Sequence, residues 1–230
     1  FARGGFDLQV GNPPWVRPDV SVETLLADGD PWWMLTKKPS LADRQERLPH
    51  TLARPGVLTT VLDGAAETEV LAEFISDQTV YPIMEGRPDL YRAFMCQVWE
   101  HQKQRGISSL IHMETHFTDA KTPGLRATTY RHLRRHWQFI NELRLFDIQD
   151  QKRYGIHVYG SIRKPSFLHA TSLYHPEAVS RSLRHDGSGE EPGFKDPHTG
   201  TWDLRPHAAR IQSGTSVRTL PASSTSMSPL

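Results

Sequence analysis

Alternation of apolar and polar residues predicts a strand near the start of the chain. From Phe6 to Val10 every second residue is apolar, which is the pattern of a strand that packs one face against a core. The alternation stops at Gly11, where an asparagine and two prolines follow and fix the backbone into a turn. Residues 16–80 contain scattered prolines and little periodicity, so we predict an irregular insertion there, with short helices at 40–48 and 66–76.

Regular periodicity begins at Asp89. Apolar residues recur at helical spacing from there to about Gln104, and Gly106 is predicted to end this helix. The segments predicted after it are a strand at 107–111, a helix at 124–137, and strands at 139–146 and 156–159. Trp99 and Trp137 fall on the apolar stripes of the two helices and are predicted core residues. Strands that alternate with helices are typical of a wound sheet, so the predicted fold class is α/β.

The last part of the chain loses this periodicity. We predict a folded domain over residues 1–165, a loop-rich extension over 166–212, and a disordered tail over 213–230, where Ser, Thr and Pro dominate. The chain contains no run of 18 apolar residues, so no membrane span is predicted. Its single cysteine, Cys96, excludes an internal disulfide and fits a reducing, cytoplasmic setting.

The distribution of charge adds a candidate surface for a polyanion. Net charge is only +1, but residues 19–90 hold 6 Lys/Arg against 13 Asp/Glu, whereas residues 120–164 hold 10 against 3. The basic side chains on the predicted helix at 124–137 include Arg131, Arg134 and Arg135. They are candidates for contact with the phosphates of double-stranded DNA, and an ordinary solvated helix face explains them equally well.

The tetrapeptide from Asn12 to Trp15, asparagine-proline-proline-tryptophan, carries the most specific chemistry in the chain. An exocyclic amine such as adenine N6 is a poor nucleophile, because its lone pair is delocalised into the ring. Two hydrogen-bond acceptors on its N–H groups favour a pyramidal nitrogen with a more available lone pair. The Asn12 side-chain carbonyl and the Pro13 backbone carbonyl are the natural acceptors. Trp15 offers a flat surface on which a flipped base can stack.

An asparagine before two prolines also makes a rigid turn in proteins of any function. Here, however, the tetrapeptide follows a predicted strand and ends in an aromatic residue, as a methylation site requires.

Residues 6–15 resemble the catalytic motif of the S-adenosylmethionine-dependent N6-adenine DNA methyltransferases. More narrowly, they resemble the type IIG-like enzymes that fuse methylase and restriction functions, and related phage-defence methylases. Residues 89–94, 109–119 and 133–143 are similar to the same group, and the resemblance extends weakly to about residue 210. It implies a partial Rossmann-like class I methyltransferase domain, made of the C-terminal half of the sheet, in a restriction–modification or phage-defence system.

The resemblance also implies roles for individual residues. Asn12, Pro13 and Trp15 would be catalytic, Pro14 would contact the substrate, and S-adenosylmethionine would be the methyl donor. The family's glycine-rich cofactor loop and ribose-binding acid lie upstream of this motif, yet only eleven residues precede Asn12. We therefore expect a fragment that binds no S-adenosylmethionine alone, with the remainder of the parent polypeptide as a partner.

Two histidines follow the predicted strand at 107–111. His112 and His116 are four residues apart, with Glu114 and Asp119 nearby, a grouping that raises the question of a metal site. Helical geometry is doubtful directly after a strand and no metalloprotease pattern fits, so we expect no metal there. From their place after an α/β strand, His112 and His116 are instead predicted to line the cleft where substrate enters.

Other functions remain open at this point. Similar turns serve methylation of guanine N2 in RNA and of glutamine in proteins, although the glutamine enzymes usually carry tyrosine where Trp15 stands. A third alternative is an inactive remnant or a DNA-binding piece of a larger enzyme.

Overall fold

The structure is a computed structural model that describes residues 4–196 and 198–214. It divides the chain into two compact units. The first, here called the sheet unit, comprises Phe1–Trp15, Ile83–Gly86 and Leu90–Leu230. The second, the helical unit, comprises Val16–Pro82 and Arg87–Asp89, so it is inserted directly after Trp15.

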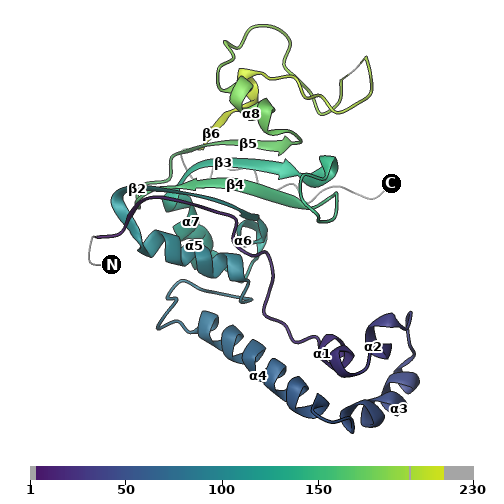
Figure 1. Ribbon diagram of the computed structural model, residues 1–230. Helices are drawn as coiled ribbons and strands as arrows, with labels where there is room; N and C mark the ends of the chain where they lie inside the picture. Colours follow the sequence, from purple (N-terminus) through teal and green to yellow (C-terminus); the bar gives the residue numbers. More distant parts are fainter. Residues whose placement is uncertain (1–3, 197, 215–230) are drawn as a thin grey trace. The chain divides into compact units, whose positions relative to one another are not determined.

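A six-stranded mixed sheet forms the centre of the sheet unit (Figure 1). Its strands are β1 (Phe6–Gly11), β2 (Gln102–Met113), β3 (Leu133–Ile140), β4 (Arg153–Tyr159), β5 (Phe167–Leu173) and β6 (Gln212–Gly214), in the order β1-β2-β4-β3-β5-β6. β1, β2, β3 and β5 share one direction, whereas β4 and β6 run opposite to them. The predicted α/β class is confirmed, and the mixed sheet is compatible with a Rossmann-like fold.

Helices cover both faces of the sheet (Figure 1). The helices are α5 (Leu90–Glu100), α6 (Thr115–Thr118) and α7 (Pro123–His132) on one face and α8 (Pro176–Ser182) on the other. Alternate residues of β2 point to the first face, where Leu110 packs with Tyr91 and Met95 of α5. On the second face, Trp137 and Phe139 of β3 pack in a separate core cluster. Trp99 and Trp137 are therefore core residues, as predicted.

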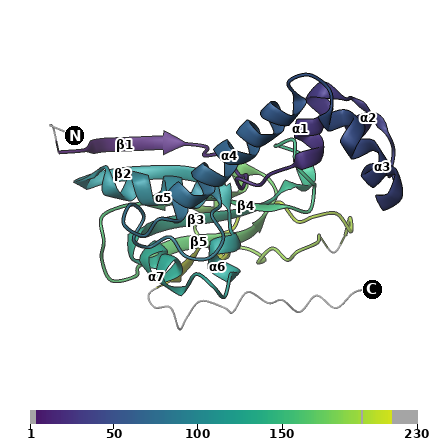
Figure 2. The ribbon, with the colours of Figure 1, turned by 90° about the horizontal axis from the view of Figure 1, so that it is seen from below.

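β1 lies beside β2 at one edge of the described sheet (Figure 2). Leu8 pairs with Ile107 and Gly11 pairs with Leu110. Apolar side chains of β1 are exposed, with Leu8 at 64% and Val10 at 74%. The predicted strand is confirmed, but the alternation does not bury its apolar face in this structure.

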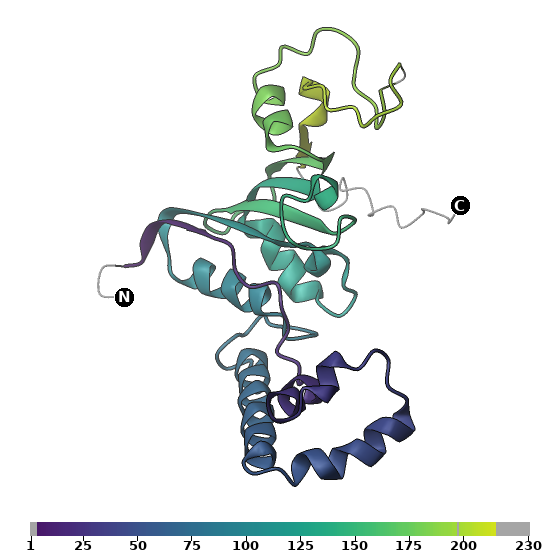
Figure 3. The same ribbon diagram turned by 45° about the vertical axis from the view of Figure 1, so that its right-hand side comes forward.

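The helical unit corrects the prediction of an irregular insertion (Figure 3). Its helices are α1 (Val22–Gly29), α2 (Trp32–Leu35), α3 (Leu41–Leu52) and α4 (Val57–Ser76). Pro31 and Pro39 lie just before α2 and α3, where a proline does not disturb a helix. Ser40 and Asp43 form a capping box that begins α3. The prolines therefore mark helix boundaries here, and only Pro49 lies inside a helix.

Three boundaries in the sheet unit differ from prediction. Gly106 lies within β2, and a Cβ there would approach Phe6 O to 2.6 Å, so glycine permits β1 to pack closely. The helix predicted at 124–137 ends at His132, and Arg134 and Arg135 belong to β3. A period of two in that segment coincides with part of a helical pattern, which is why the strand was missed.

The predicted strand at 139–146 is also displaced. β3 ends at Ile140, because Asn141 starts a 3₁₀ turn and its side chain accepts a hydrogen bond from Phe146 N at 3.1 Å. The extension at 166–212 is not merely loop, since it supplies β5, α8 and the first residue of β6 to the sheet unit. The predicted disordered tail begins inside β6, and residues 215–230 lie outside the described residues. None of the helices in the described ranges has the length and apolarity needed to cross a membrane.

The core of the helical unit contains one buried carboxylate. Asp30 is 3% exposed and accepts hydrogen bonds from Arg47 Nε at 2.8 Å and from Thr51 Oγ1 at 2.7 Å. The bond from Arg47 and the lesser ones from Thr51 and Trp32 N hold the pKa of Asp30 well below its usual range, against the opposing effect of burial. Because the folded-state pKa is depressed, this carboxylate stabilises the fold above its unfolded pKa.

Replacing Asp30 with asparagine is therefore expected to destabilise the helical unit by about 2–3 kcal/mol at pH 7, since Arg47 loses its charged partner. The wild-type advantage should shrink as pH falls from about 4 towards the depressed pKa. Urea titration followed by far-UV circular dichroism at pH 7 and pH 3 measures both. Glu23→Gln, in the exposed pair with Arg44, is the control and should change stability by less than about 0.5 kcal/mol. Equal losses in the two variants would contradict the assignment.

Candidate functional site

The asparagine-proline-proline-tryptophan turn begins at the carboxyl end of β1. Asn12 and Pro14 are exposed, Pro13 is buried, and Trp15 is half-buried. No hydrogen bond of the Asn12 side chain occurs within the described residues, so its carbonyl and amide groups face solvent unused. The Asn12 side chain is therefore exposed, whereas Pro13, the next residue, is buried.

Trp15 ties this turn to the sheet. Its indole Nε1 donates a hydrogen bond to Ile111 O at 3.0 Å. Its ring lies 5.2 Å from the ring of Phe146 and 5.8 Å from that of Tyr154, with the latter stacked. These contacts fix the indole in one position and thereby fix the three residues before it.

Because β1 and β2 are parallel, the two predicted site segments that follow them lie at the same end of the strands. Asn12 follows β1, and Glu114 follows β2, which pairs with β1 in parallel. In open α/β sheets, ligands bind outside the carboxyl ends of the parallel strands. The turn and the end of β2 thus occupy the edge at which a ligand site is expected.

His112 and His116, predicted to line a cleft, are completely buried in this structure. His112 Nδ1 hydrogen-bonds Met113 O at 2.7 Å, and its Nε2 bonds the Tyr159 hydroxyl at 2.9 Å. Burial lowers the pKa of His112 to about 4, so the ring is neutral, with Nδ1 as donor and Nε2 as acceptor. Direct contact of either histidine with substrate stays a prediction, and it would require these rings to become exposed.

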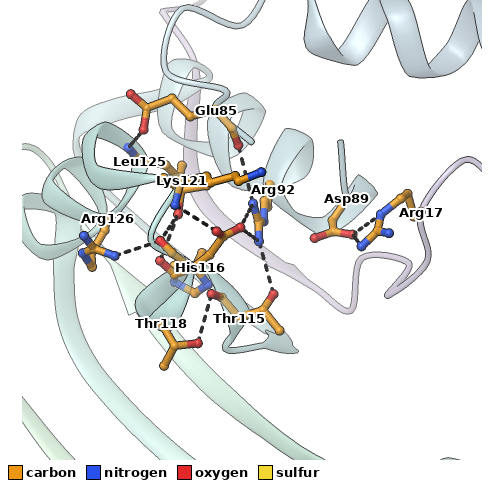
Figure 4. A network of polar contacts seen from close by, with 12 residues as sticks. Arg17, Glu85, Asp89, Arg92, Thr115, His116, Thr118, Lys121, Leu125 and Arg126 are labelled. Atoms are coloured by element: carbon orange, nitrogen blue, oxygen red, sulfur yellow. Dashed lines mark hydrogen bonds and ion pairs between the residues drawn. The ribbon is translucent and has the colours of Figure 1, made fainter. Parts of the chain in front are cut away.

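A buried arginine positions the segment that carries these histidines (Figure 4). Arg92 of α5 is 2% exposed and donates from both terminal nitrogens to Asp119 Oδ2 at 3.2 Å. Its Nη2 also reaches Thr115 Oγ1 at 3.3 Å, and the Tyr91 hydroxyl accepts from His116 N at 3.1 Å. Asp119 thus forms an ion pair with Arg92, and this ion pair accounts for its position without a metal site.

Three side chains of residue types that can bind metal ions lie close together in the sheet unit. Glu114 Oε1 forms an ion pair with His136 Nε2, and its Oε2 accepts a hydrogen bond from Gln138 Nε2 at 2.5 Å. One potential ligand atom from each of Glu114, His136 and His157 lies within 4.8 Å of the others. Burial alone would raise the pKa of Glu114, but the charge and hydrogen bond of His136 bring it below its usual range. Glu114 is therefore ionised at neutral pH.

His157 is the unusual member of this group. It is completely buried, and neither ring nitrogen has a hydrogen-bond partner among the described residues. Each buried polar atom left in this condition costs about 1–3 kcal/mol. Burial is the main cause that holds the pKa of His157 well below 6.5. The ring is neutral and keeps a lone pair that no protein donor uses.

His136 and His157 were missed as site residues from the sequence. They are direct partners in the β3–β4 ladder, but the prediction placed His136 on a helix. A usable signal existed for His157, which interrupts the mostly apolar strand β4, but not for His136, which lies among polar residues of β3. The spacing of His112 and His116 drew attention to those two residues instead.

The arginines predicted to contact phosphates divide into two kinds. Arg134 Nη1 donates to the backbone oxygens of His132 at 2.9 Å and Leu133 at 3.1 Å, and its Nη2 donates to Ser161 O. Arg131 and Arg135 are exposed, with no side-chain partner in the described ranges. All three lie where β3 begins, at the opposite edge of the sheet from the carboxyl end of β1. At about 3.3 Å per residue, β3 separates the two edges by roughly 20 Å.

A cavity of about 230 Å³ lies elsewhere, between β5 and the segment 191–212. None of its lining residues belongs to the turn or to the histidine group. It therefore adds nothing to the candidate site.

Comparison with known proteins gives limited information. Nothing matches among protein-family models or among curated proteins. Among solved structures, the chain is similar to the "ATP-dependent Type ISP restriction-modification enzyme LlaBIII bound to DNA", with 11% identity and a TM-score of 0.37 over 73% of this chain and 10% of that one. It is also similar to a nuclease-deletion mutant of the Type ISP enzyme LlaGI in complex with a DNA substrate mimic, with 12% identity and a TM-score of 0.33 over 70% and 12%. The chain spans about a tenth of each enzyme, and likenesses of this size carry no argument about function.

The two kinds of arginine should respond differently to truncation. Arg134→Ala is expected to lower the free energy of unfolding by about 1–3 kcal/mol, because several backbone oxygens lose their donor. Arg135→Ala, on the same strand but exposed, should change it by less than about 0.5 kcal/mol. Urea titration followed by circular dichroism provides the comparison. An effect of Arg135→Ala as large as that of Arg134→Ala would refute the distinction.

Proposed function

We propose that the turn from Asn12 to Trp15 holds the target amine of a methyl transfer, and that the target is adenine N6 in double-stranded DNA. The observation that carries the proposal is the outward-facing, unpartnered Asn12 side chain on a rigid turn at the carboxyl end of a parallel strand. The sequence resemblance to N6-adenine DNA methyltransferases favours adenine, and a role in restriction–modification or phage defence is proposed on the same ground.

The chemistry asked of these residues is positioning and charge complementarity. The Asn12 side-chain oxygen and the Pro13 backbone oxygen accept the two N–H groups of the amine, which directs its lone pair away from the ring. Positive charge grows on this nitrogen as its bond to the methyl carbon forms, and the two oxygens stabilise it. Neither has to remove a proton before the transfer. A fixed turn achieves this better than a flexible loop, because little reorganisation is needed.

Trp15 has two proposed tasks. Its hydrogen bond to Ile111 O and its ring contacts hold the turn, while the exposed part of the half-buried indole offers a surface for the target base. Pro14, which is exposed and directly precedes Trp15, is proposed to contact the base or its sugar.

S-adenosylmethionine is the proposed donor, but its binding residues are not among those described. Of the strands that share one direction, β1 leads to α1 through residues 12–21, β2 to α6 through Glu114, β3 directly into the 3₁₀ turn at Asn141, and β5 to α8 through residues 174–175. None of these connections is the glycine-rich turn that brings a backbone close to such a cofactor. We therefore derive no step from donor contacts and assign this chain the amine side of the reaction only.

Two other functions use the same turn. Guanine N2 in RNA and a protein glutamine are amines of similar chemistry, and an inactive DNA-binding piece would keep the basic residues without catalysis. The exposure of Arg131 and Arg135 favours a nucleic acid over a peptide. If they contact phosphate, they do so some distance from the target base, because they lie at the other edge of the sheet.

Asn12→Ala in the natural full-length polypeptide is expected to lower kcat about 100-fold or more, with KM for DNA little changed, because the lost acceptor acts mainly in the transition state. Transfer of labelled methyl groups from S-adenosylmethionine to duplex DNA, RNA and a glutamine peptide measures it. Asp7→Asn, an exposed change on the same strand, is the control. Label in RNA or peptide but not in DNA would replace adenine by the alternative substrate, and an undiminished kcat for Asn12→Ala would remove the catalytic role.

The double variant Arg131→Gln, Arg135→Gln should weaken duplex binding and flatten its salt dependence. Each lost phosphate contact lowers the slope of log K against log salt by about 0.9. Fluorescence anisotropy of a labelled duplex over a range of NaCl concentrations gives the slope. Lys37→Gln with Lys38→Gln, the same change of charge in the acidic region, is the matched control. A slope unchanged in the arginine variant would place the DNA contacts elsewhere.

A further inference from the structure

The proposed methyl transfer gives no role to the group formed by Glu114, His136 and His157. We propose that these three side chains bind a divalent first-row transition metal ion, of which Zn²⁺ is the representative. The site is separate from the turn at Asn12 and would stand even if the proposed methylation were wrong.

The sheet topology brings the three side chains together. Glu114 follows β2, His157 lies on β4, and His136 lies on β3, the neighbour of β4 on its other side. His136 and His157 are paired in the antiparallel ladder, so their rings lie side by side, with centroids 4.9 Å apart. The three potential ligand atoms already lie within 4.8 Å of one another. Ligand atoms bound to a tetrahedral zinc ion at about 2.0–2.2 Å lie roughly 3.4 Å apart, so the Glu114–His136 ion pair has to open for an ion to enter between its members.

His157 is an independent indication of a missing ligand. Its ring is fully buried, and neither nitrogen has a hydrogen-bond partner among the described residues. His116 is in the same condition, but only His157 offers a nitrogen close to Glu114 and His136. By contrast, the equally buried His112 stacks on it at 3.9 Å with both of its own nitrogens hydrogen-bonded. A buried imidazole without hydrogen-bond partners, with a nitrogen within 4.8 Å of a carboxylate oxygen and of a second imidazole nitrogen, is an arrangement in which a cation is favourable.

Gly155 keeps space open at this position. It lies two residues before His157 on β4 and faces the same side of the sheet. A Cβ at Gly155 would lie 2.8 Å from His157 Nε2 and 2.9 Å from Glu114 Oε1. Any side chain there would therefore intrude between two of the proposed ligands. Because the glycine φ is not in the left-handed region, the space rather than the backbone conformation requires glycine.

The donor set selects the class of metal. Two imidazole nitrogens and one carboxylate oxygen suit zinc and its first-row neighbours, whereas Mg²⁺ and Ca²⁺ prefer oxygen ligands throughout. Glu114 and His136 side chains retain 11–12% exposure, which gives the ion a route from solvent. Three protein ligands leave at least one coordination position for water or another small ligand.

The test is metal binding by the 230-residue protein after treatment with a chelator. We expect equilibrium dialysis with elemental analysis to give one Zn²⁺ per chain, unaffected by millimolar Mg²⁺. Glu114→Gln, which keeps the shape and hydrogen-bonding capacity of the side chain, and His157→Gln should each weaken Zn²⁺ binding by more than the roughly 10–100-fold typical of residues that only orient a ligand. His132→Gln is the matched control, because His132 is also buried and is bonded to Gly160 O outside the group.

Spectroscopy keeps the proposal testable if a variant fails to fold. Co²⁺ added to the wild-type protein should give the visible bands of a four- or five-coordinate ion, and Zn²⁺ should displace them. Retention of Zn²⁺ by folded Glu114→Gln, equal loss in His132→Gln, or a Co²⁺ spectrum no different from that of the hydrated ion would each overturn the assignment. Loss of the bands in the ligand variants alone, with circular dichroism unchanged, would support it.

Discussion

The parallel pairing of β1 with β2 is the interaction on which the candidate site depends. It places Gly11 beside Leu110, and so brings the turn that begins at Asn12 to the end of β2. The indole of Trp15 then closes the arrangement by bonding to Ile111 O. Neither segment has this geometry alone, because a turn of two prolines is rigid internally but has no fixed place until its strand is paired.

The other half of the sheet unit is organised by polar groups that are buried under α5, α6 and α7. Arg92 connects α5 to Asp119, and this contact holds the segment from Glu114 to Phe117 against the sheet. Burying such groups is costly unless they are paired, and most of them are. The exceptions among the described residues include Trp99, His116 and His157, and of these only His157 belongs to the group with Glu114 and His136.

Much of the α/β pattern was predictable, and what was missed has physical causes. β1 and the helix of α5 were found because their periodicity is local. The strand β3 was mistaken for helix because Leu133 and Trp137, which are four residues apart, fit both a period of two and helical spacing. Short helices were predicted at 40–48 and 66–76, where α3 and α4 lie, but the rest of the helical unit was missed because prolines suggest irregular structure unless their position at helix starts is known. His136 and His157 could not be joined from sequence, since only the β3–β4 register brings them together.

The insertion of the helical unit between β1 and β2 has a consequence for folding. Residues 12–101 separate two strands that must pair in parallel, so β1 cannot find its partner until the intervening chain has been synthesised. The entropy of closing so long a loop rises only slowly with length, and helices that form early on their own core shorten the effective distance. The strand that leads into the turn at Asn12 is thus synthesised before its partner and paired late, and until then both of its backbone edges are open to aggregation.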